Sequence, residues 1–202
     1  GDRLVMVDHL GRIADGDQLL YVIASDRKRA GTLQGPVVGT VMSNLGLEQK
    51  LQAEGVEFLR AKVGDRYVLA MLKEHGGVLG GETSGHLLCL DRTTTGDGLV
   101  SALEVLAVMK RTGRPLAELV AGMPKFPQVM INVRVRERID PSQSQVIQDA
   151  VRCVEKVLGS TGRVVLRASG TEPVIRVMIE AEQEAVASRY ANELADVVRT
   201  AI

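Results

Sequence analysis

The stretch RVVLRASGTEPVIRVMIEA, residues 163–181, decides the fold of the C-terminal part of the chain. Residues 163–167 and 174–181 are apolar runs rich in β-branched side chains, and glycine and proline lie between them. Such runs predict strands, and the residues between them predict a tight connecting loop. This part of the chain is therefore expected to contain a pair of strands joined by a short loop.

Helices are predicted on both sides of this pair. A strand at 129–135 and a helix at 142–158 precede it, and a helix at 184–202 closes the chain. The resulting βαββα order predicts a small α+β domain in which both helices cover one face of a sheet. Apolar residues at helical spacing should form the covering faces. They are Val146, Ala150, Val154 and Val157 in one helix, and Val186, Tyr190, Leu194 and Val197 in the other.

The loop between the two strands combines groups that suit a phosphate dianion. Guanidinium groups, hydroxyls and exposed backbone N–H groups all donate hydrogen bonds, and glycine lets the backbone come close to a ligand. From composition alone, an ordinary turn with a surface arginine on either side fits equally well. The candidate phosphate-binding residues are Arg167, Ser169, Gly170, Thr171 and Arg176.

The preceding part of the chain alternates strand and helix signals over roughly 120 residues. This alternation predicts an α/β domain with helices packed on a mixed, largely parallel sheet. The pattern breaks at 122–127, where two prolines and a glycine occur close together. We place a domain boundary there, with one domain at 12–122 and the other at 123–202.

Three local patterns lead to specific expectations in the first part. The run 4–8 predicts a short buried strand. Asp15 and Asp17 precede an apolar-periodic stretch that continues to about residue 29, where they suit a helix cap. Residues 97–111 predict a helix with one apolar face, made of Leu99, Leu103, Leu106 and Met109.

Composition and charge exclude several classes of protein. The 202 residues are 45% hydrophobic and 25% charged, which is typical of a globular protein and not of a disordered one. With 25 basic and 25 acidic residues the net charge is zero, so we expect no nucleic-acid partner. No long apolar span or leader pattern is present, so we expect no membrane partner and a soluble, cytoplasmic protein. Cys89 and Cys153 lie in apolar or amphipathic runs and are expected to be buried, reduced thiols.

A second polar loop, Gly81–His86, lies between two short strands at 78–80 and 87–90. A carboxylate beside hydroxyls suits the hydroxyls of a sugar, so Glu82 and Ser84 are candidate sugar-binding residues. His86 is a candidate proton acceptor or phosphate contact. A polar hairpin tip without a ligand is the alternative that the residues leave open.

Asp2 is a candidate ligand for a hard cation, because Mg²⁺ prefers carboxylate oxygens. One carboxylate does not make a metal site, and by itself Asp2 fits an exposed terminal residue equally well.

Taken together, these stretches resemble the α-D-phosphohexomutase family along the whole chain. Gly1-Asp2-Arg3 looks like the end of its Asp-Gly-Asp-x-Asp-Arg magnesium loop, Gly81–His86 like its sugar-specificity loop, and 167–176 like its phosphate loop. Softer matches indicate the members that act on glucosamine phosphates. These are Val7-Asp8-His9, Asp15-Gly-Asp-Gln-Leu19, Val63-Gly-Asp-Arg-Tyr-Val68 and Thr94-Thr-Gly-Asp-Gly98.

The resemblance implies the organisation and the cofactors of a longer protein. Residues 1–11 would be the tail of the family's second domain, 12–122 its third, sugar-binding domain and 123–202 its fourth, phosphate-binding domain. Asp2 would be one of three aspartates that hold Mg²⁺ with a phosphorylated serine, and Arg3 would adjoin them as a candidate catalytic residue. No serine here is followed by His-Asn-Pro, the family's phosphoserine context, so the phosphoryl donor would lie in N-terminal domains that this chain lacks.

The implied reaction interconverts glucosamine 6-phosphate and glucosamine 1-phosphate through a sugar bisphosphate, which also acts as activator. Without the phosphoserine, the chain by itself is expected to be inactive, and a homo-oligomer is compatible with the resemblance. Thr83 departs from the glutamine expected in the glucosamine enzymes, which keeps a phosphomannomutase or phosphoglucomutase of the same family as an alternative. A non-catalytic module that binds sugar phosphates is the second alternative.

Overall fold

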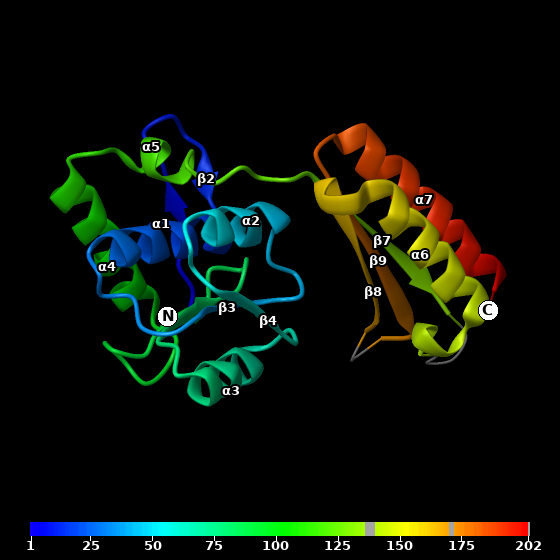
Figure 1. The fold of residues 1–202 in the computed structure, drawn as a ribbon, viewed down its shortest axis with the longest axis horizontal. Helices are drawn as coiled ribbons and strands as arrows, with labels where there is room; N and C mark the ends of the chain where they lie inside the picture. The colour runs from blue at the N-terminus through cyan, green and yellow to red at the C-terminus, as the bar shows by residue number, and fades with distance from the viewer. Residues whose placement is uncertain (136–139, 170–171, 202) are drawn as a thin grey trace. The chain divides into compact units, whose positions relative to one another are not determined.

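The computed structural model describes residues 1–135, 140–169 and 172–201 of the chain. The chain forms two compact units, Gly1–Lys125 and Phe126–Ile202 (Figure 1). The division falls inside the stretch 122–127 that the glycine and the prolines indicated. The assignment of residues 1–11 to a preceding domain stays a prediction, although these residues pack with the first unit here.

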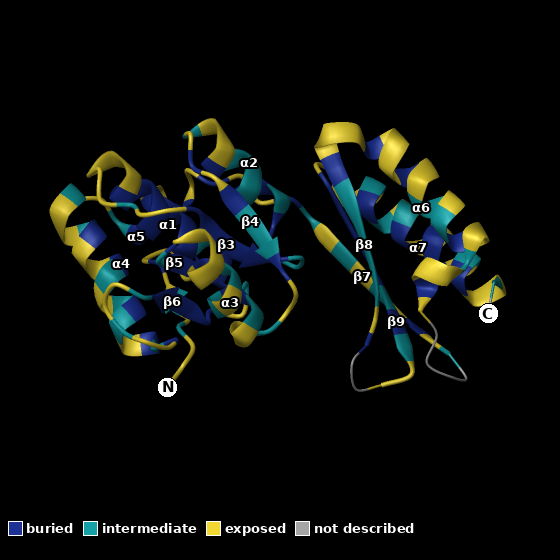
Figure 2. Cartoon of the chain, turned by 60° about the horizontal axis from the view of Figure 1, so that its bottom comes forward, coloured by how far each residue is buried: buried dark blue, intermediate teal, exposed yellow. Residues whose placement is uncertain are grey.

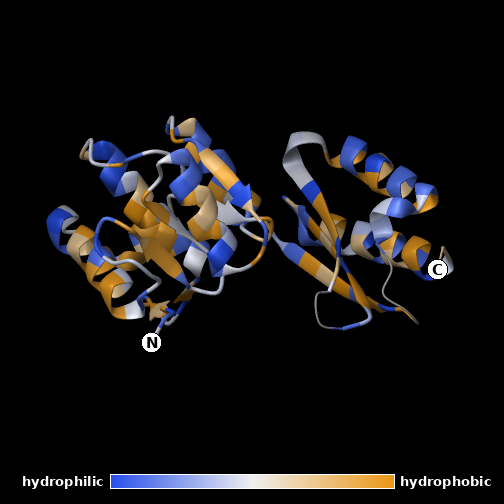
Figure 3. Cartoon of the chain, turned by 90° about the horizontal axis from the view of Figure 1, so that it is seen from below, coloured by the Kyte–Doolittle hydropathy of each residue, from blue (hydrophilic) through white to orange (hydrophobic). Residues whose placement is uncertain are grey.

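The first unit is built around a four-stranded sheet with the order β4-β3-β5-β6. Strand β3 pairs in parallel with β4 and β5, and β6 returns antiparallel to β5, so the predicted mixed, largely parallel α/β sheet is confirmed. The elements are β1 (Met6–Val7), β2 (Ile13–Ala14), α1 (Gly16–Arg29), β3 (Val37–Thr40), α2 (Leu45–Ala53), β4 (Phe58–Ala61), α3 (Asp65–His75), β5 (Leu79–Gly81), β6 (Leu87–Cys89), α4 (Gly98–Thr112) and α5 (Leu116–Val120). Strands β3, β5 and β6 are buried along their whole length, and the interior of this unit is largely hydrophobic (Figure 3).

The prediction of a buried strand at 4–8 is wrong. Only Met6–Val7 is a strand, and it pairs antiparallel with Ile13–Ala14, a strand that the sequence pattern did not indicate. The side chains of Val7 and Ile13 are 58% and 67% exposed. The apolar run at 4–8 therefore contains one strand of a two-stranded ribbon whose outer face is exposed, and it is not a strand of the central sheet.

Helix α1 begins with a complete capping box. The carboxylate of Asp15 accepts from Gln18 N at 3.0 Å, and the Gln18 side chain accepts from Asp15 N at 3.2 Å. This arrangement satisfies two backbone donors that a helix start leaves without partners. Asp17 does not share that role, contrary to prediction, because its side chain turns into the protein and is fully buried.

Helix α4 forms where it was predicted, but of the four residues predicted to face the core only Met109 packs against it, and only in part. Leu99 and Leu103 are 71% and 59% exposed, and Leu106 is also exposed, whereas Val105 and Val108 are buried. Exposed and buried segments alternate along the ribbon of α4 (Figure 2). Both faces carry apolar residues at helical spacing, so periodicity alone did not separate them. The buried face contains Ser101, whose small side chain hydrogen-bonds to the carbonyl oxygen of Asp97 and is almost wholly buried.

The second unit has the predicted βαββα order. Its elements are β7 (Gln128–Arg134), the short 3-10 turn Pro141–Gln143, α6 (Gln145–Leu158), a second turn at Gly159–Thr161, β8 (Gly162–Ala168), β9 (Val174–Ala181) and α7 (Glu184–Thr200). The three strands form an antiparallel sheet with β9 in the centre, and α6 and α7 cover one of its faces (Figure 1).

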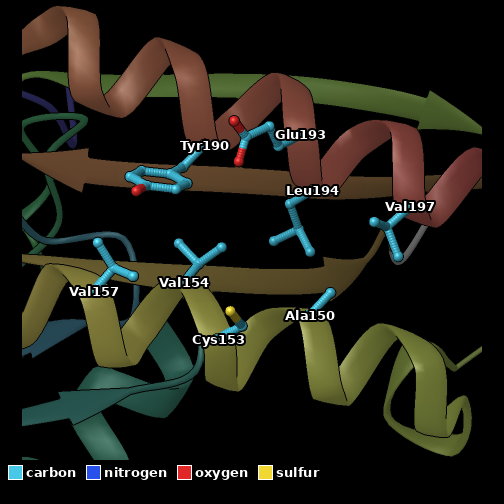
Figure 4. Close-up of a pocket in the computed structure, with 8 residues that line it drawn as sticks. All are labelled: Ala150, Cys153, Val154, Val157, Tyr190, Glu193, Leu194 and Val197. Carbon is cyan, nitrogen blue, oxygen red and sulfur yellow. The ribbon is translucent and has the colours of Figure 1, made fainter.

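The predicted apolar stripes on α6 and α7 are only partly directed at the sheet. Several of their residues line a groove between the two helices, with a volume of about 180 Å³ (Figure 4). Val146 and Val157 are 61% and 60% exposed, whereas Ala187 and Ala191 are fully buried. Ala187 and Ala191 pack in the core of this unit together with Val198, whereas Tyr190 and Val197 line the groove.

The two cysteines differ in their surroundings. Cys89 is buried in the first unit, and burial raises its pKa to about 11, so the thiol stays protonated at neutral pH. Cys153 is exposed, so its predicted burial is wrong.

Among the residues that the structure describes, no helix combines the length and the apolar character that crossing a membrane requires.

The cap of α1 leads to a stability prediction. We expect Asp15→Ala to lower the free energy of unfolding by about 1 kcal/mol, because it removes the hydrogen bond to Gln18 N. Asp15 also forms an ion pair with Lys125 at 2.6 Å. Asp15→Asn is the matched control, since it keeps a capping oxygen and loses the charge. Urea unfolding followed by circular dichroism should give a smaller loss for Asn than for Ala; equal losses would assign the effect to the ion pair.

Candidate functional site

Several polar segments meet at one edge of the first sheet. Strands β3, β4 and β5 are parallel, so the segments that follow them leave the sheet on the same side. These segments are 41–44, 62–64 and 82–86, and the first two lead directly into the N-termini of α2 and α3. The carboxyl edge of a parallel sheet is where α/β proteins bind ligands, and helix N-termini there favour anions.

The loop 82–86, predicted to bind a sugar, is held against the first turn of α1. Gly16 N donates to the carbonyl oxygen of Thr83 at 3.0 Å. A Cβ atom on Gly16 would lie only 2.0 Å from the carbonyl oxygen of Glu82, so no larger residue fits there. The N-terminal segment holds the other side, because Leu4 N donates to the carbonyl oxygen of Gly85 at 3.0 Å.

The conformation of the loop itself depends on Gly85. Its φ is +90°, a value that other residues rarely adopt. Gly85 N donates to the carbonyl oxygen of Glu82 at 2.9 Å, and Glu82 N donates to that of His86 at 2.9 Å. The loop is therefore a closed turn with a defined shape.

The two candidate sugar-binding residues differ in their surroundings. The Glu82 carboxylate is half-buried and accepts from Gly64 N, before α3, at 2.9 Å. One of its oxygens is thus engaged and its orientation is restricted. Ser84 lies at the exposed tip of the loop. Between them, the Thr83 hydroxyl donates to Asp17 Oδ2 at 2.8 Å. Both candidate roles stay predictions, but the loop holds them in a defined arrangement.

His86 connects the loop to the start of the chain. Its Nδ1 lies 3.2 Å from Asp2 Oδ2, and its side chain is buried. Nε2 is also buried, without a hydrogen-bond partner, and it packs against Gly96, where a Cβ atom would come within 2.2 Å of it. The predicted loop, the segment 1–4 and the stretch 94–98 are thus brought together around one imidazole ring. An acid or base role of His86 stays a prediction.

Asp2 and Arg3, the candidate metal ligand and its neighbour, are exposed. A hydrogen bond from its own backbone, followed by the contact with His86, lowers the pKa of Asp2, so its carboxylate is ionised at neutral pH. Within the described ranges, no three histidine, cysteine or acidic side chains gather closely enough to hold a metal ion. Asp2 supplies one oxygen ligand, whereas Mg²⁺ requires about six ligands in an octahedron, so the residues described here do not form a magnesium site.

In the second unit, the two arginines predicted to bind phosphate lie directly opposite each other. Arg167 of β8 pairs in register with Arg176 of the central strand β9. Residues opposite each other in antiparallel strands project from the same face, so two positive charges share one site. Burial, and then the charge of Arg176, lower the pKa of Arg167. The Nε atoms of both arginines are buried and have no hydrogen-bond partner among the residues that the structure describes, which is costly unless a ligand accepts from them.

The register also adds a residue that sequence reasoning missed. Asn132 of β7 lies opposite Arg176, so Asn132, Arg176 and Arg167 form one row across the sheet. Asn132 is exposed, and its amide is a further hydrogen-bond donor on the arginine side. Its position became visible only from strand pairing, since it lies far from the predicted loop in sequence.

The remaining residues of the predicted phosphate loop are only partly described. Ser169 is buried, and its hydroxyl accepts from Glu172 N at 3.3 Å. Its backbone N–H donates to the carbonyl oxygen of Val174 at 2.8 Å, which closes the base of the loop. Gly170 and Thr171 lie outside the described residues, and their predicted roles stay predictions.

Comparison with known proteins identifies the family of both units. Residues 15–126 match the family model described as phosphoglucomutase/phosphomannomutase, alpha/beta/alpha domain III, and residues 130–197 match that of the C-terminal domain. The phosphoglucosamine mutase of Alkalilimnicola ehrlichii is 57% identical over 201 residues, and that of Methylococcus capsulatus is 56% identical over 201 residues. Both alignments cover 100% of this chain but 45% of the relative, so the chain spans less than half the length of these proteins.

Solved structures show the same fold. A phosphoglucomutase/phosphomannomutase family protein from Burkholderia thailandensis has a TM-score of 0.79 and 25% identity, covering 100% of this chain and 45% of that one. An N-acetylphosphoglucosamine mutase of Aspergillus fumigatus, in complex with GlcNAc-6P and magnesium, has a TM-score of 0.81 and 21% identity, covering 98% of this chain and 50% of that one. The resemblance to phosphohexomutases that the motifs indicated is confirmed. The chain belongs to the phosphoglucomutase/phosphomannomutase family, of which it contains domain III and the C-terminal domain.

Proposed function

We propose that this chain is the C-terminal part of a phosphoglucosamine mutase that interconverts glucosamine 6-phosphate and glucosamine 1-phosphate. The observation that carries the proposal is the pair Arg167 and Arg176, two half-buried guanidinium groups whose Nε atoms have no partner. A phosphate dianion supplies both the charge and the acceptors that this pair lacks. The high identity to proteins named phosphoglucosamine mutase supports the choice of the sugar.

The second unit would hold the phosphate that is not being transferred. Arg167, Arg176 and Ser169 would donate to it, with Gly170 and Thr171 of the same loop and the amide of Asn132 beside them. Because phosphoryl transfer depends chiefly on positioning and on charge neutralisation, such a fixed anchor would set the position of the sugar.

The first unit would bind the sugar ring. The loop 82–86 has a defined shape, and its exposed tip presents the hydroxyl of Ser84. Glu82 keeps one carboxylate oxygen beyond the one that accepts from Gly64 N, and it would accept from a sugar hydroxyl.

The rest of the magnesium site and the phosphoryl donor would be supplied by segments outside this chain. Asp2 would contribute one ligand, and the remaining aspartates and the phosphoserine would come from preceding domains, since the relatives are more than twice as long as their aligned part. A sugar bisphosphate would act as intermediate and activator. We also place the protein in the cytoplasm, because the substrates proposed for it are soluble sugar phosphates.

A first prediction concerns the arginine pair. We expect Arg167→Ala to weaken binding of glucosamine 6-phosphate by about 1.5–3 kcal/mol, roughly a tenfold to hundredfold rise in Kd. Since like charges directly opposite each other are destabilising, the variant should melt at the same or a higher temperature than the unaltered chain. Calorimetric titration and thermal unfolding measure the two effects.

The matched control is Arg189→Ala, which removes an exposed arginine of α7 that pairs with Glu193 at 2.7 Å. It should leave the affinity for the sugar phosphate unchanged. Unchanged affinity in Arg167→Ala, or a marked loss of thermal stability, would contradict the phosphate role.

A second prediction separates this chain from the longer protein. The chain alone should show no mutase turnover with glucosamine 6-phosphate, a bisphosphate activator and Mg²⁺, because it lacks the phosphoserine. The same coupled assay should detect turnover with the protein extended at its N-terminus. Turnover by the chain alone would refute the assignment of the phosphoryl donor to a preceding domain.

One observation supports a second candidate function. Thr83 occupies the position where the glucosamine enzymes are expected to have glutamine. A phosphomannomutase or phosphoglucomutase activity of the longer protein would be revealed by a higher kcat/KM for mannose or glucose phosphates than for glucosamine 6-phosphate. If the extended protein binds sugar phosphates but converts none of them, the remaining interpretation is that it is a non-catalytic binding module.

A further inference from the structure

Asp17 is a fully buried carboxylate in the first turn of α1. It makes no bond to its own helix start, where Asp15 provides the cap. Its Oδ2 instead accepts from Asn44 N, which precedes α2, at 2.9 Å, and from the Thr83 hydroxyl at 2.8 Å. These partners lie 27 and 66 residues away in sequence, so one carboxylate connects three separate segments.

Burying this carboxylate is costly. Burial raises the pKa of Asp17 to about 6, and the hydrogen bonds from Asn44 N and from the Thr83 and Ser43 side chains offset that rise only in part. The negative charge of Asp15 raises it further, although Asp15 is itself paired with Lys125 at 2.6 Å. The second oxygen, Oδ1, is buried without a hydrogen-bond partner. An apolar or neutral side chain would avoid this cost, so the carboxylate needs another explanation.

Thr83 is the link between Asp17 and the sugar loop. Its carbonyl oxygen accepts from Gly16 N, and its hydroxyl donates to Asp17, so the first turn of α1 holds this residue at two points. Its neighbours in the chain are Glu82 and Ser84, the two candidate sugar-binding residues. A movement of the Thr83 backbone would therefore displace both of them.

The charge state of Asp17 determines the direction of the hydrogen bond. An ionised carboxylate has no proton to donate, so the Thr83 hydroxyl must donate to it. A protonated carboxylate can donate instead, and the hydroxyl is then free to turn. In the ionised form, Oδ2 accepts from the Thr83 hydroxyl and from Asn44 N together, so the hydroxyl is held in one orientation.

We propose that Asp17 is a positioning residue for the sugar loop, which it holds in its binding shape through the hydroxyl of Thr83. The role rests on the function proposed above, because it assigns a specific support to the loop that would bind the sugar. Asp17 would not touch the sugar itself. Its ionisation would be linked to the order of the loop 82–86.

The test uses three variants of this chain and one control. Thr83→Val removes the hydroxyl and keeps the shape, Thr83→Ser restores a hydroxyl, and Asp17→Asn removes the charge. The control is Thr112→Val in α4, since the Thr112 hydroxyl also makes a 2.8 Å hydrogen bond, to the carbonyl oxygen of Val108. Amide hydrogen exchange, recorded by NMR, gives the protection factors of residues 82–86 in each protein.

We expect Thr83→Val to lower protection of the loop by roughly threefold to thirtyfold, which corresponds to one lost hydrogen bond. Thr83→Ser should recover most of this loss, and Thr112→Val should leave the loop unchanged. Equal protection in Thr83→Val and the unaltered chain would overturn the proposal, as would a failure of Thr83→Ser to recover it.

The pH dependence gives a readout that a purely structural contact would not produce. The amide signal of Asn44 should titrate with a midpoint near pH 6 in the unaltered chain, because its N–H bonds to Asp17, and should not do so in Asp17→Asn. The pKa of Asp17 is higher in the folded chain than its ordinary value of 3.8, so the folded state holds the Asp17 proton more tightly than the unfolded state. The contribution of this proton to the free energy of unfolding is therefore fully present below about pH 4 and is lost as the pH rises through 6. The melting temperature of the unaltered chain, relative to Asp17→Asn, should fall over that range.

Binding of glucosamine 6-phosphate separates this proposal from the proposed function. If the unaltered chain binds the sugar phosphate and Thr83→Val binds it more weakly, both stand. If no protein binds it but loop protection and the Asn44 titration behave as expected, the positioning contact stands and the proposed function fails. If Thr83→Val and the unaltered chain show equal protection of residues 82–86, the positioning role fails whatever the affinity.

Discussion

The close approach of α1 to the loop 82–86 is the contact on which the site in the first unit depends. It is possible only because Gly16 has no side chain, since a Cβ atom there would lie 2.0 Å from the carbonyl oxygen of Glu82. The approach puts a hydrogen-bond donor of α1 on Thr83 and brings the buried carboxylate of Asp17 to the same residue. With the helix start in place, the loop has a backbone frame on one side and the N-terminal segment, through Leu4, on the other.

Both units keep polar groups in an unfavourable state at their candidate sites. In the second unit, Arg167 and Arg176 are opposite each other with buried Nε atoms, and in the first unit Asp17 has a buried oxygen without a partner. Folding alone does not favour such groups, because each costs free energy that an apolar residue would not. The cost is offset when a ligand, or a segment that a ligand orders, supplies the missing interaction. These positions are therefore the candidate binding sites of the two units.

Much of this arrangement could be predicted from single segments. The hairpin around residues 163–181, the alternation of strands and helices and the boundary at 122–127 all depend on local composition. The hairpin and the alternation were confirmed, and the two compact units divide within 122–127. Helix faces were less predictable. Leu99 and Leu103 of α4 have the spacing of a buried stripe but are exposed, because Val105 on the other side has equally good spacing and the small Ser101 beside it allows closer packing. Periodicity finds a helix, but it does not choose between two apolar faces.

The sequence by itself determined the family, the order of the elements and the residues that carry the charge and the hydroxyls, because these are properties of short stretches read in order. Only the tertiary structure decided which of them act together. Asp17 looked like a second cap beside Asp15, and Asn132 looked like an ordinary strand residue. Their roles depend on Thr83 and Arg176, partners that are distant in sequence. Strand register and the crossing of a helix over a loop create these contacts, and neither leaves a local pattern.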